Sequence, residues 1–335
     1  MKLSEAEIQV LATLRLAEIE GLGSDRASLE AEGDRFWVYL EDWSDSYHEL
    51  TKKGLITGGD HHFALTADGR VLATAYHQQR PDHYWYYYQR FYPAALASDA
   101  HSELCRRVFG QDLTEEGQMD MEALEGLLGR LSLSEGDRVL DLGCGAGAIS
   151  EYISDTTGTV VTGVDYAASA VKAANARTTN KRDRLGFIEG DLNQLQLVRE
   201  SFDAAVLIDS IYWAADPSAT LASILASLKT GGQMAVVIVQ TLEDGDGREL
   251  LEAENTEVGV ALASLGVDYV VFDDTDAFLA FWPRMKEAVV ELRPIFDREG
   301  NGFIADALEA EADEEYLPAI QDDAIRRYTY LIRKE

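Results

Sequence analysis

The feature that most limits the fold of this chain is an apolar stretch that runs directly into a glycine-rich turn. Residues 139–147 read VLDLGCGAG, with glycines at positions 143, 145 and 147. Because glycine carries no Cβ, such a turn lets a ligand approach the backbone closely. The stretch predicts a buried strand, a ligand-binding turn and a following helix, which together begin an α/β fold with a parallel sheet.

Strand-like and helix-like segments alternate from about residue 131 to the end of the chain. Short apolar runs rich in β-branched residues are separated by segments with helical spacing. We expect strands at 138–141, 159–165, 186–189, 204–209, 233–239, 269–272 and 327–332. The predicted architecture of residues 131–335 is therefore a doubly wound, Rossmann-like sheet of seven strands.

The first 80 residues predict a smaller, separate domain. Ser4 and Glu7 have capping-box spacing ahead of a helix that Gly21 ends. A second helix is expected over residues 36–53, and residues 53–65 predict a β-hairpin around a glycine turn. Helices followed by a two-stranded wing resemble the winged-helix domains, so residues 1–80 predict a winged-helix-like α+β domain.

The charge of the chain excludes several classes of partner. It carries 60 acidic and 29 basic residues, a net charge of −31, which repels nucleic-acid phosphates and anionic membranes. Residues 1–80 hold fourteen acidic and eight basic side chains, and the expected recognition helix carries Glu41, Asp42, Asp45 and Glu49. We therefore interpret the domain as a homodimerisation or substrate-capping module, without a nucleic-acid or membrane partner. The acidity fits a salt-rich cytoplasm, where self-repulsion is screened, and an ordinary acidic enzyme about equally well.

Two further observations concern the compartment and metal content. No apolar run approaches the roughly 18–20 residues that a membrane helix needs, and the N-terminal residues turn acidic at once. The chain has only Cys105 and Cys144, so the sequence predicts a cytoplasmic protein without a disulfide framework. His61 and His62 in the predicted hairpin lack partners at ligand spacing, and no metal site is expected.

Residues 81–130 predict a helical connector with a dense aromatic run from Tyr84 to Tyr92. Tyr84, Tyr88 and Tyr92 lie four residues apart and would share one helix face. Two interpretations stay open: packing between domains, or an aromatic wall over a ligand, especially a cationic one. On the second interpretation these three tyrosines bind the substrate.

The glycine turn by itself is ambiguous, because Gly143, Gly145 and Ala148 also match the dinucleotide-binding fingerprint. Asp141 lies directly before the glycines, where its carboxylate would meet a pyrophosphate unfavourably. Four further elements follow in order: VD at 164–165, EGDL at 189–192, FDAAVLIDSIYW at 202–213 and LKTGG at 228–232. With these motifs, residues 115–335 resemble the class I S-adenosylmethionine-dependent methyltransferases, particularly the UbiE-like small-molecule group. The fifth element departs from the family in having Thr230 in place of proline in its turn.

The resemblance implies S-adenosyl-L-methionine as the cofactor and assigns residues to it. Asp141 would lie near the methionine moiety and favour its positive charges. Asp165 would accept hydrogen bonds from both ribose hydroxyls, with Tyr166 against the adenine. Asp191 would accept from the adenine amino group, and the backbone N–H of Leu192 would reach the ring. The remaining expected cofactor contacts are the turn glycines and the end of the fourth strand: Gly143, Gly145, Gly147 and Asp209.

The chemistry places few demands on side chains. Methyl transfer by in-line displacement needs positioning and desolvation, and a general base only when the acceptor starts protonated. All six histidines lie before residue 102. The candidates for a catalytic base are therefore Asp209, Tyr212 and His101, although His101 is more simply interpreted as a helix-surface side chain. Tyr212 and Trp213, after the fourth strand, would line the acceptor site, and core packing stays open as the other interpretation of Trp213.

An apolar stripe near the C-terminus predicts one more helix, between the last two strands. Its members are Phe278, Phe281, Trp282, Met285, Val289 and Leu292. Such a stripe is either core or a cover over the substrate, and on the second interpretation Trp282 contacts the acceptor.

The sequence thus predicts an enzyme that methylates a small molecule at nitrogen, oxygen or carbon. The Asn-Pro-Pro-Tyr-like residues of base and glutamine methylases are missing after the fourth strand, and no Pro-Cys nucleophile is present. Two alternatives stay open: a winged-helix regulator that senses S-adenosylmethionine, and a nicotinamide-dependent oxidoreductase.

Overall fold

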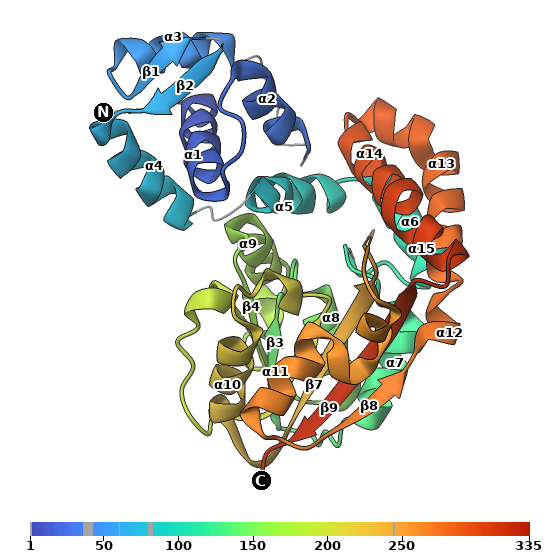
Figure 1. Cartoon of the computed structure of the whole chain (residues 1–335). Coiled ribbons are helices and arrows are strands. Elements are labelled where there is room, and N and C mark those ends of the chain that lie inside the picture. Colours follow the sequence, from blue (N-terminus) through green and yellow to red (C-terminus); the bar gives the residue numbers. More distant parts are fainter. Residues whose placement is uncertain (1, 36–42, 60, 80–82, 115, 244) are drawn as a thin grey trace. The chain divides into compact units, whose positions relative to one another are not determined.

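The computed structural model describes residues 2–35, 43–59, 61–79, 83–114, 116–243 and 245–335 (Figure 1). The chain divides into two compact units, Met1–Phe91 and Tyr92–Glu335. Helix α5 (His83–Ala95) spans the division. The finer division at residues 80 and 130 stays a prediction.

The first unit contains the helices and the hairpin expected from the sequence. Its elements are α1 (Glu5–Glu20), α2 (Arg26–Arg35), α3 (Ser44–Lys52), β1 (Ile56–Gly59), β2 (His62–Leu65) and α4 (Ala67–Gln79). Ser4 and Glu7 form the predicted capping box, and Gly21 ends α1 in the left-handed conformation at φ 72°. The antiparallel β1–β2 pairing confirms the hairpin.

The helix expected over residues 36–53 is confirmed only in its second half, which is α3. Its first half, with Glu41 and Asp42, lies outside the described residues. Helix α2 was not predicted. The core of the unit gathers Leu11, Trp43 and Leu50 with Tyr47 and Phe63, whose rings stack at 4.5 Å.

The second unit is built on the predicted sheet of seven strands. Its strands are β3 (Arg138–Leu142), β4 (Val160–Asp165), β5 (Leu185–Glu189), β6 (Phe202–Ile208), β7 (Leu228–Thr241), β8 (Tyr269–Asp273) and β9 (Ile325–Arg333). They lie in the order β5-β4-β3-β6-β7-β9-β8, with β9 antiparallel to both of its neighbours. The seven-stranded, Rossmann-like prediction is confirmed. Because β3 pairs with both β4 and β6, the ends of β3, β4 and β6 meet at one edge.

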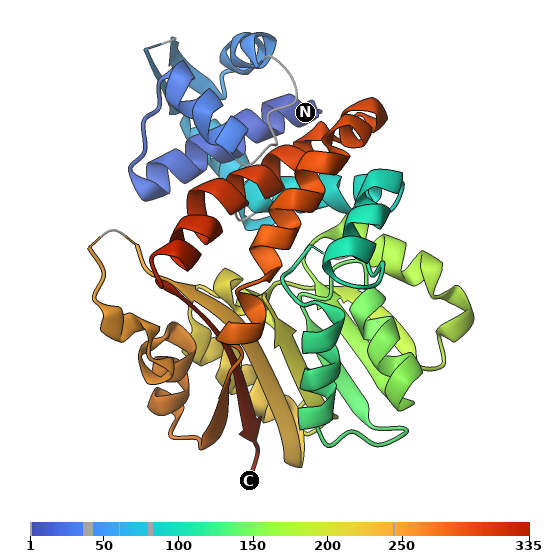
Figure 2. The ribbon, with the colours of Figure 1, turned by 90° about the vertical axis from the view of Figure 1, so that its right-hand side faces the viewer.

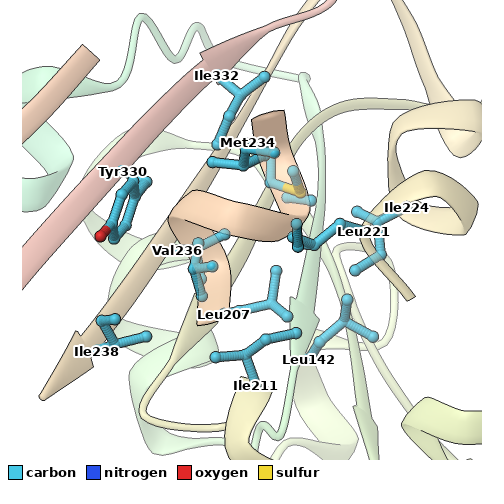
Figure 3. Packing of buried hydrophobic residues seen from close by; sticks show 14 of the residues in the cluster. Leu142, Leu207, Ile211, Leu221, Ile224, Met234, Val236, Ile238, Tyr330 and Ile332 are labelled. Carbon is cyan, nitrogen blue, oxygen red and sulfur yellow. The ribbon is translucent and has the colours of Figure 1, made fainter. Parts of the chain in front are cut away.

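Helices cover both faces of this sheet. The apolar side chains of α7 (Met121–Arg130), α8 (Ala148–Thr157) and α9 (Ala168–Arg177) pack on one face. Those of α10 (Pro217–Ser227) and α11 (Glu257–Leu265) pack on the other. Figure 3 shows this second layer, where Leu221 and Ile224 of α10 meet Leu207, Val236 and Met234 of the strands.

A further helical layer lies beyond the carboxyl ends of the parallel strands (Figures 1 and 2). It comprises α6 (Asp99–Val108), α12 (Thr275–Phe278), α13 (Phe281–Glu299), α14 (Gly302–Ala310), a π-helical segment η6 (Glu311–Tyr316) and α15 (Leu317–Gln321). The predicted apolar stripe is confirmed as the buried side of α12 and α13. Among the described helices, none is long and apolar enough to cross a membrane.

The structure differs from the sequence analysis at LKTGG, residues 228–232, where a turn was expected. The structure places these residues inside β7, where pairing passes from Phe202 with Leu228 to Ala204 with Gln233. The extra residues of β7 form a bulge, and Gly231 in it adopts φ 80°. A left-handed glycine occurs both in a turn and in a bulge, so the paired glycines do not distinguish the two.

Candidate cofactor and acceptor site

The glycine turn joins β3 to α8 and requires glycine at three positions. Gly143, Gly145 and Gly147 have φ values of 77°, 51° and 73°, in the left-handed region. A Cβ at Gly143 would overlap Ser210, and one at Gly147 would overlap the Phe187 ring. The backbone N–H groups of Gly143 and Cys144 both donate to the carbonyl of Val164, at 2.8 and 3.1 Å. This sharp turn keeps the backbone at the strand ends uncovered by side chains of its own.

Asp141 is a buried carboxylate beneath this turn, 3% exposed. The hydroxyl of Ser150 in α8 donates to its Oδ2 at 2.5 Å. Its other oxygen has no hydrogen-bond partner among the residues that the structure describes. Asp141 does not cap α8, because the N-cap of that helix is Gly147. Asp141 therefore keeps acceptor capacity for a ligand.

Asp165 ends β4 and holds the turn through its side chain. The backbone N–H groups of Gly145 and Ala167 donate to its two oxygens, each at 2.8 Å. A carboxylate oxygen accepts two hydrogen bonds, so one acceptor position remains on each oxygen. That pair is what two ribose hydroxyls would require.

Both carboxyls have perturbed acidity. Burial raises the pKa of Asp165 to about 6, against the hydrogen bonds from Ala167 and Gly145. Burial likewise raises the pKa of Asp141 to about 6, with the Ser150 hydroxyl opposing the shift and the charge of Asp165 adding to it. Two adjacent, poorly solvated carboxylates favour a cation and oppose a pyrophosphate. The residues present therefore fit a cofactor that carries sulfonium and ammonium charges.

This acidity predicts a pH dependence of cofactor affinity. Because a cation binds the ionised carboxylates, we expect the affinity for S-adenosylmethionine to fall about ten- to a hundredfold between pH 7 and pH 5. The contribution of Asp141 and Asp165 to folding stability changes with pH in the opposite direction to the affinity. Their folded pKa lies above the unfolded value, so between about pH 4 and 6 the folded state holds more protons and their contribution to stability falls as pH rises.

Calorimetric titration at pH 5, 6 and 7 measures this dependence on affinity. Affinity that is flat across the series would contradict the assignment of Asp141 and Asp165 to a cationic ligand.

The remaining predicted cofactor residues lie at the same edge of the sheet. Asp191 follows β5 and caps the short 3₁₀ helix η2 (Leu192–Gln194) by accepting from Asn193 N–H at 2.8 Å. Leu192 packs its side chain against the core and is held in place by it. Tyr166 is half-buried directly after Asp165. The assignment of these three residues to adenine stays a prediction.

Asp209, directly after β6, is placed differently from what its predicted role as a base requires. It is a non-glycine residue with φ 49°, and its side chain, 6% exposed, forms a bidentate ion pair with Arg327 of β9. The guanidinium nitrogens lie 2.5 and 2.9 Å from the carboxylate oxygens, and the backbone N–H of Gln118 donates at 3.0 Å. A carboxylate occupied in this way does not favour proton abstraction. We interpret Asp209 as a positioning residue.

Gln118 joins this ion pair to two aromatic rings. Its side-chain amide donates to the Tyr316 hydroxyl at 2.9 Å, and its oxygen accepts from the Trp282 indole at 2.9 Å. The rings of Trp282 and Tyr316 stack with centroids 4.1 Å apart. Trp282 is only 1% exposed and Tyr316 is half-buried, so Tyr316 is the more exposed ring of the stacked pair.

The other predicted substrate and catalytic residues differ in exposure: Tyr212 and Trp213 reach the surface, whereas His101 is buried. Tyr212 is 43% exposed, and its hydroxyl accepts from the backbone N–H of Val239 at 2.5 Å. Trp213 is half-buried beside it in the chain. His101 is 1% exposed, with its ring 3.6 Å from the Cys105 sulfur inside α6. This burial does not favour a role for His101 as a base.

The tyrosines of α5 are only partly described. The side chain of Tyr84 lies outside the described residues, and Tyr88 is half-buried. Tyr92 is buried, and a Cβ on Gly145 would overlap its hydroxyl. Of the three, Tyr92 is thus placed at the glycine turn.

Sequence reasoning missed four residues of this site: Gln118, Ser150, Tyr316 and Arg327. Arg327 carried a signal, since it is a charged residue inside an apolar strand that was itself predicted. The other three lie in a loop, a helix and a π-helical segment without a distinguishing pattern.

Comparison with known proteins connects the carboxyl edge of the sheet to methyltransferases. Residues 140–236 match the family model described as a methyltransferase domain. That range holds the glycine turn, Asp165, Asp191 and Asp209. This part of the second unit is therefore similar to a methyltransferase domain.

Individual relatives share about 30% identity or less with this chain, over part of its length. The chain is 30% identical over 125 residues to methyltransferase GfsG of Streptomyces halstedii, which covers 36% of this chain and 45% of the relative. It is 28% identical over 182 residues to 27-O-demethylrifamycin SV methyltransferase of Amycolatopsis mediterranei, which covers 50% of this chain and 66% of that one. The chain thus spans less than half of the first relative and about two thirds of the second.

A solved structure shows the same fold. Phosphoethanolamine N-methyltransferase 2 of Haemonchus contortus superimposes with a TM-score of 0.53 at 20% identity, over 74% of this chain and 60% of that one. At this identity the likeness concerns the fold alone.

Proposed function

We propose that the protein transfers the methyl group of S-adenosylmethionine to a small-molecule acceptor by in-line displacement, as the UbiE-like enzymes do. The observation that carries the proposal is the glycine turn with two buried, adjacent carboxylates at the carboxyl edge of the sheet. When bound, the cofactor supplies the electrophilic methyl group. The chain's part is to bind and orient: Asp165 and Asp141 grip a cationic nucleoside, and the Asp209–Arg327 pair holds the turn after β6 in one conformation.

The test is a methyl-transfer assay with isotopically labelled cofactor and a metabolite extract, read by mass spectrometry. We expect label in at least one small molecule with the wild-type protein and much less with Asp165→Ala at the same, subsaturating cofactor concentration. Transfer of label to nucleic acid or protein alone would contradict the proposal.

Asp165→Ala is expected to weaken the binding of S-adenosylhomocysteine by about 1–3 kcal/mol, or roughly 5- to 150-fold. The change removes the acceptors for the ribose and also two hydrogen bonds that shape the turn. Asp183→Ala is the matched control, because Asp183 is an exposed carboxylate just before β5. Equal affinities of the two variants in a calorimetric titration would remove the ribose assignment.

For the first unit we propose a winged-helix-like domain that dimerises the protein or covers its substrate. The β1–β2 hairpin after three helices and the excess of acidic side chains support this role over DNA binding. Light scattering coupled to gel filtration measures the oligomer. A shift of genomic DNA fragments at low salt would contradict the proposal and favour a regulator.

A further inference from the structure

The helical layer beyond the strand ends contains a carboxylate, Glu311, that has no role in the proposed function described above. Glu311 begins the π-helical segment η6, and its side chain is half-buried. It has no ion pair or hydrogen bond among the residues that the structure describes. Its neighbours differ, because Glu309 and Asp313 both contact Lys286, at 3.7 and 2.7 Å. An unpaired carboxylate in a poorly solvated position is costly unless a cation joins it.

The surroundings of Glu311 include an aromatic ring. Glu311, Glu315 and Tyr316 belong to the same six-residue segment η6, and burial, followed by the charges of Glu315 and Glu311, raises the pKa of the Tyr316 hydroxyl. Burial and then the charge of Glu315 also raise the pKa of Glu311, to about 8. Carboxylates beside an aromatic ring are the combination that recognises an ammonium group.

Hydrogen bonds connect Tyr316 to the carboxyl edge of the sheet, where the cofactor is expected. Tyr316 is held by Gln118, whose backbone N–H donates to Asp209 at the end of β6. Tyr212, in the turn after β6, interacts electrostatically with both Tyr316 and Glu315. That turn also contains Ser210, which fills the space beside Gly143. Hydrogen bonds and electrostatic interactions therefore link the end of β6 to the segment η6, which contains Glu311, within the second unit.

We propose that Glu311 and Tyr316 form the acceptor subsite of this enzyme and that the acceptor is an amine. The proposal rests on the proposed function and narrows it from nitrogen, oxygen or carbon to nitrogen. Glu311 is the counter-charge of the ammonium form, and the Tyr316 ring, supported by Trp282 and Gln118, is its aromatic neighbour. A neutral alcohol of the same shape would leave Glu311 unpaired.

The chemistry balances with groups already present. The ammonium gives one proton to the Glu311 carboxylate and becomes a neutral amine with a free electron pair. That pair forms the new bond to the methyl carbon as the carbon–sulfur bond breaks, and the electrons of the broken bond stay on sulfur. The products are a methylated ammonium ion and neutral S-adenosylhomocysteine, and Glu311 then releases its proton to solvent. Among the described carboxylates near Tyr316, Asp209 is paired with Arg327 and Glu315 is hydrogen-bonded to Tyr316, so Glu311 is the carboxylate that takes the proton.

The test uses the full-length protein loaded with S-adenosylhomocysteine and three matched pairs of probes. These pairs are ethanolamine with ethylene glycol, 2-phenylethylamine with 2-phenylethanol, and tryptamine with tryptophol. We expect at least one amine to bind ten times more tightly than its alcohol in calorimetric titration. Glu311→Gln keeps the shape of the side chain and is expected to abolish that preference. Glu314→Gln, at an exposed position of η6, is expected to retain it.

Three results distinguish failure of this inference from failure of the proposed function. If S-adenosylhomocysteine itself does not bind, the proposed function fails. If it binds but no amine exceeds its alcohol, including the case in which no probe binds, the amine inference is overturned. A preference that survives in Glu311→Gln also overturns it, because another group would then recognise the amine.

Discussion

Replacing Arg327 with methionine is expected to lower the free energy of unfolding by about 3–5 kcal/mol. Arg327 is 3% exposed and its partner Asp209 is 6% exposed, so the change leaves a buried carboxylate without its counter-charge. Burial by itself lowers the pKa of the Arg327 guanidinium, but the charge and hydrogen bonds of Asp209 act against it, and the pKa lies above its ordinary value. Urea denaturation followed by circular dichroism measures the loss.

Arg326→Met is the matched control for this prediction. Arg326 precedes Arg327 on β9 but pairs with an Asp323 side chain that is 69% exposed. Solvent screens that pair, and its loss is expected to cost about 0–1 kcal/mol. Asp209→Asn combined with Arg327→Met is expected to cost less than the sum of the two single changes, because both break one interaction. Equal costs of Arg326→Met and Arg327→Met would show that the buried pair does not hold the turn.

Gly143→Ala is expected to destabilise the fold by about 2–5 kcal/mol. Two costs add at this position: φ is 77°, which disfavours any side chain, and the new Cβ overlaps Ser210 Cβ. Ser210 cannot move away freely, since it is buried and donates to the Leu142 carbonyl at 2.7 Å. Binding of S-adenosylhomocysteine is expected to fall as well, because the shifted turn no longer presents its backbone to the ligand.

Gly126→Ala provides a control of opposite sign. Gly126 lies inside α7, and nothing lies within 4 Å of a Cβ added there. Alanine in a helix interior is expected to raise stability by about 0.5–1 kcal/mol. Thermal unfolding of both variants checks the pair, and a Gly143→Ala protein as stable as the wild type would contradict the account of the turn.

The sheet was predictable because its signals are local. Each strand is a short apolar run, and parallel strands in a doubly wound fold bring their carboxyl ends together, so Asp141 and Asp165 could be placed from the sequence. The bulge in β7 was read as a turn because both need a left-handed glycine, and only the pairing with β6 distinguishes them.

The acceptor side of the site was less predictable because its contacts join distant parts of the chain. Asp209 and Arg327 lie 118 residues apart, and Gln118 reaches Trp282 and Tyr316 from a loop without periodicity. The π-helical segment EADEEY shows no apolar spacing in the sequence, so Glu311 and Tyr316 had no local pattern that would mark them. The apolar stripe of α13 was predicted, but the more exposed ring of the stacked pair, Tyr316, belongs to the neighbouring segment η6.

The central claim is that the turn at Gly143–Gly147 binds a methyl-bearing sulfonium nucleoside. Parallel calorimetric titrations of the wild-type protein with S-adenosylmethionine, S-adenosylhomocysteine and NADH test it most directly. The account predicts saturable binding of both sulfur nucleosides and none of NADH, whose pyrophosphate would meet the Asp141 carboxylate. Saturable binding of NADH without binding of S-adenosylmethionine would contradict it.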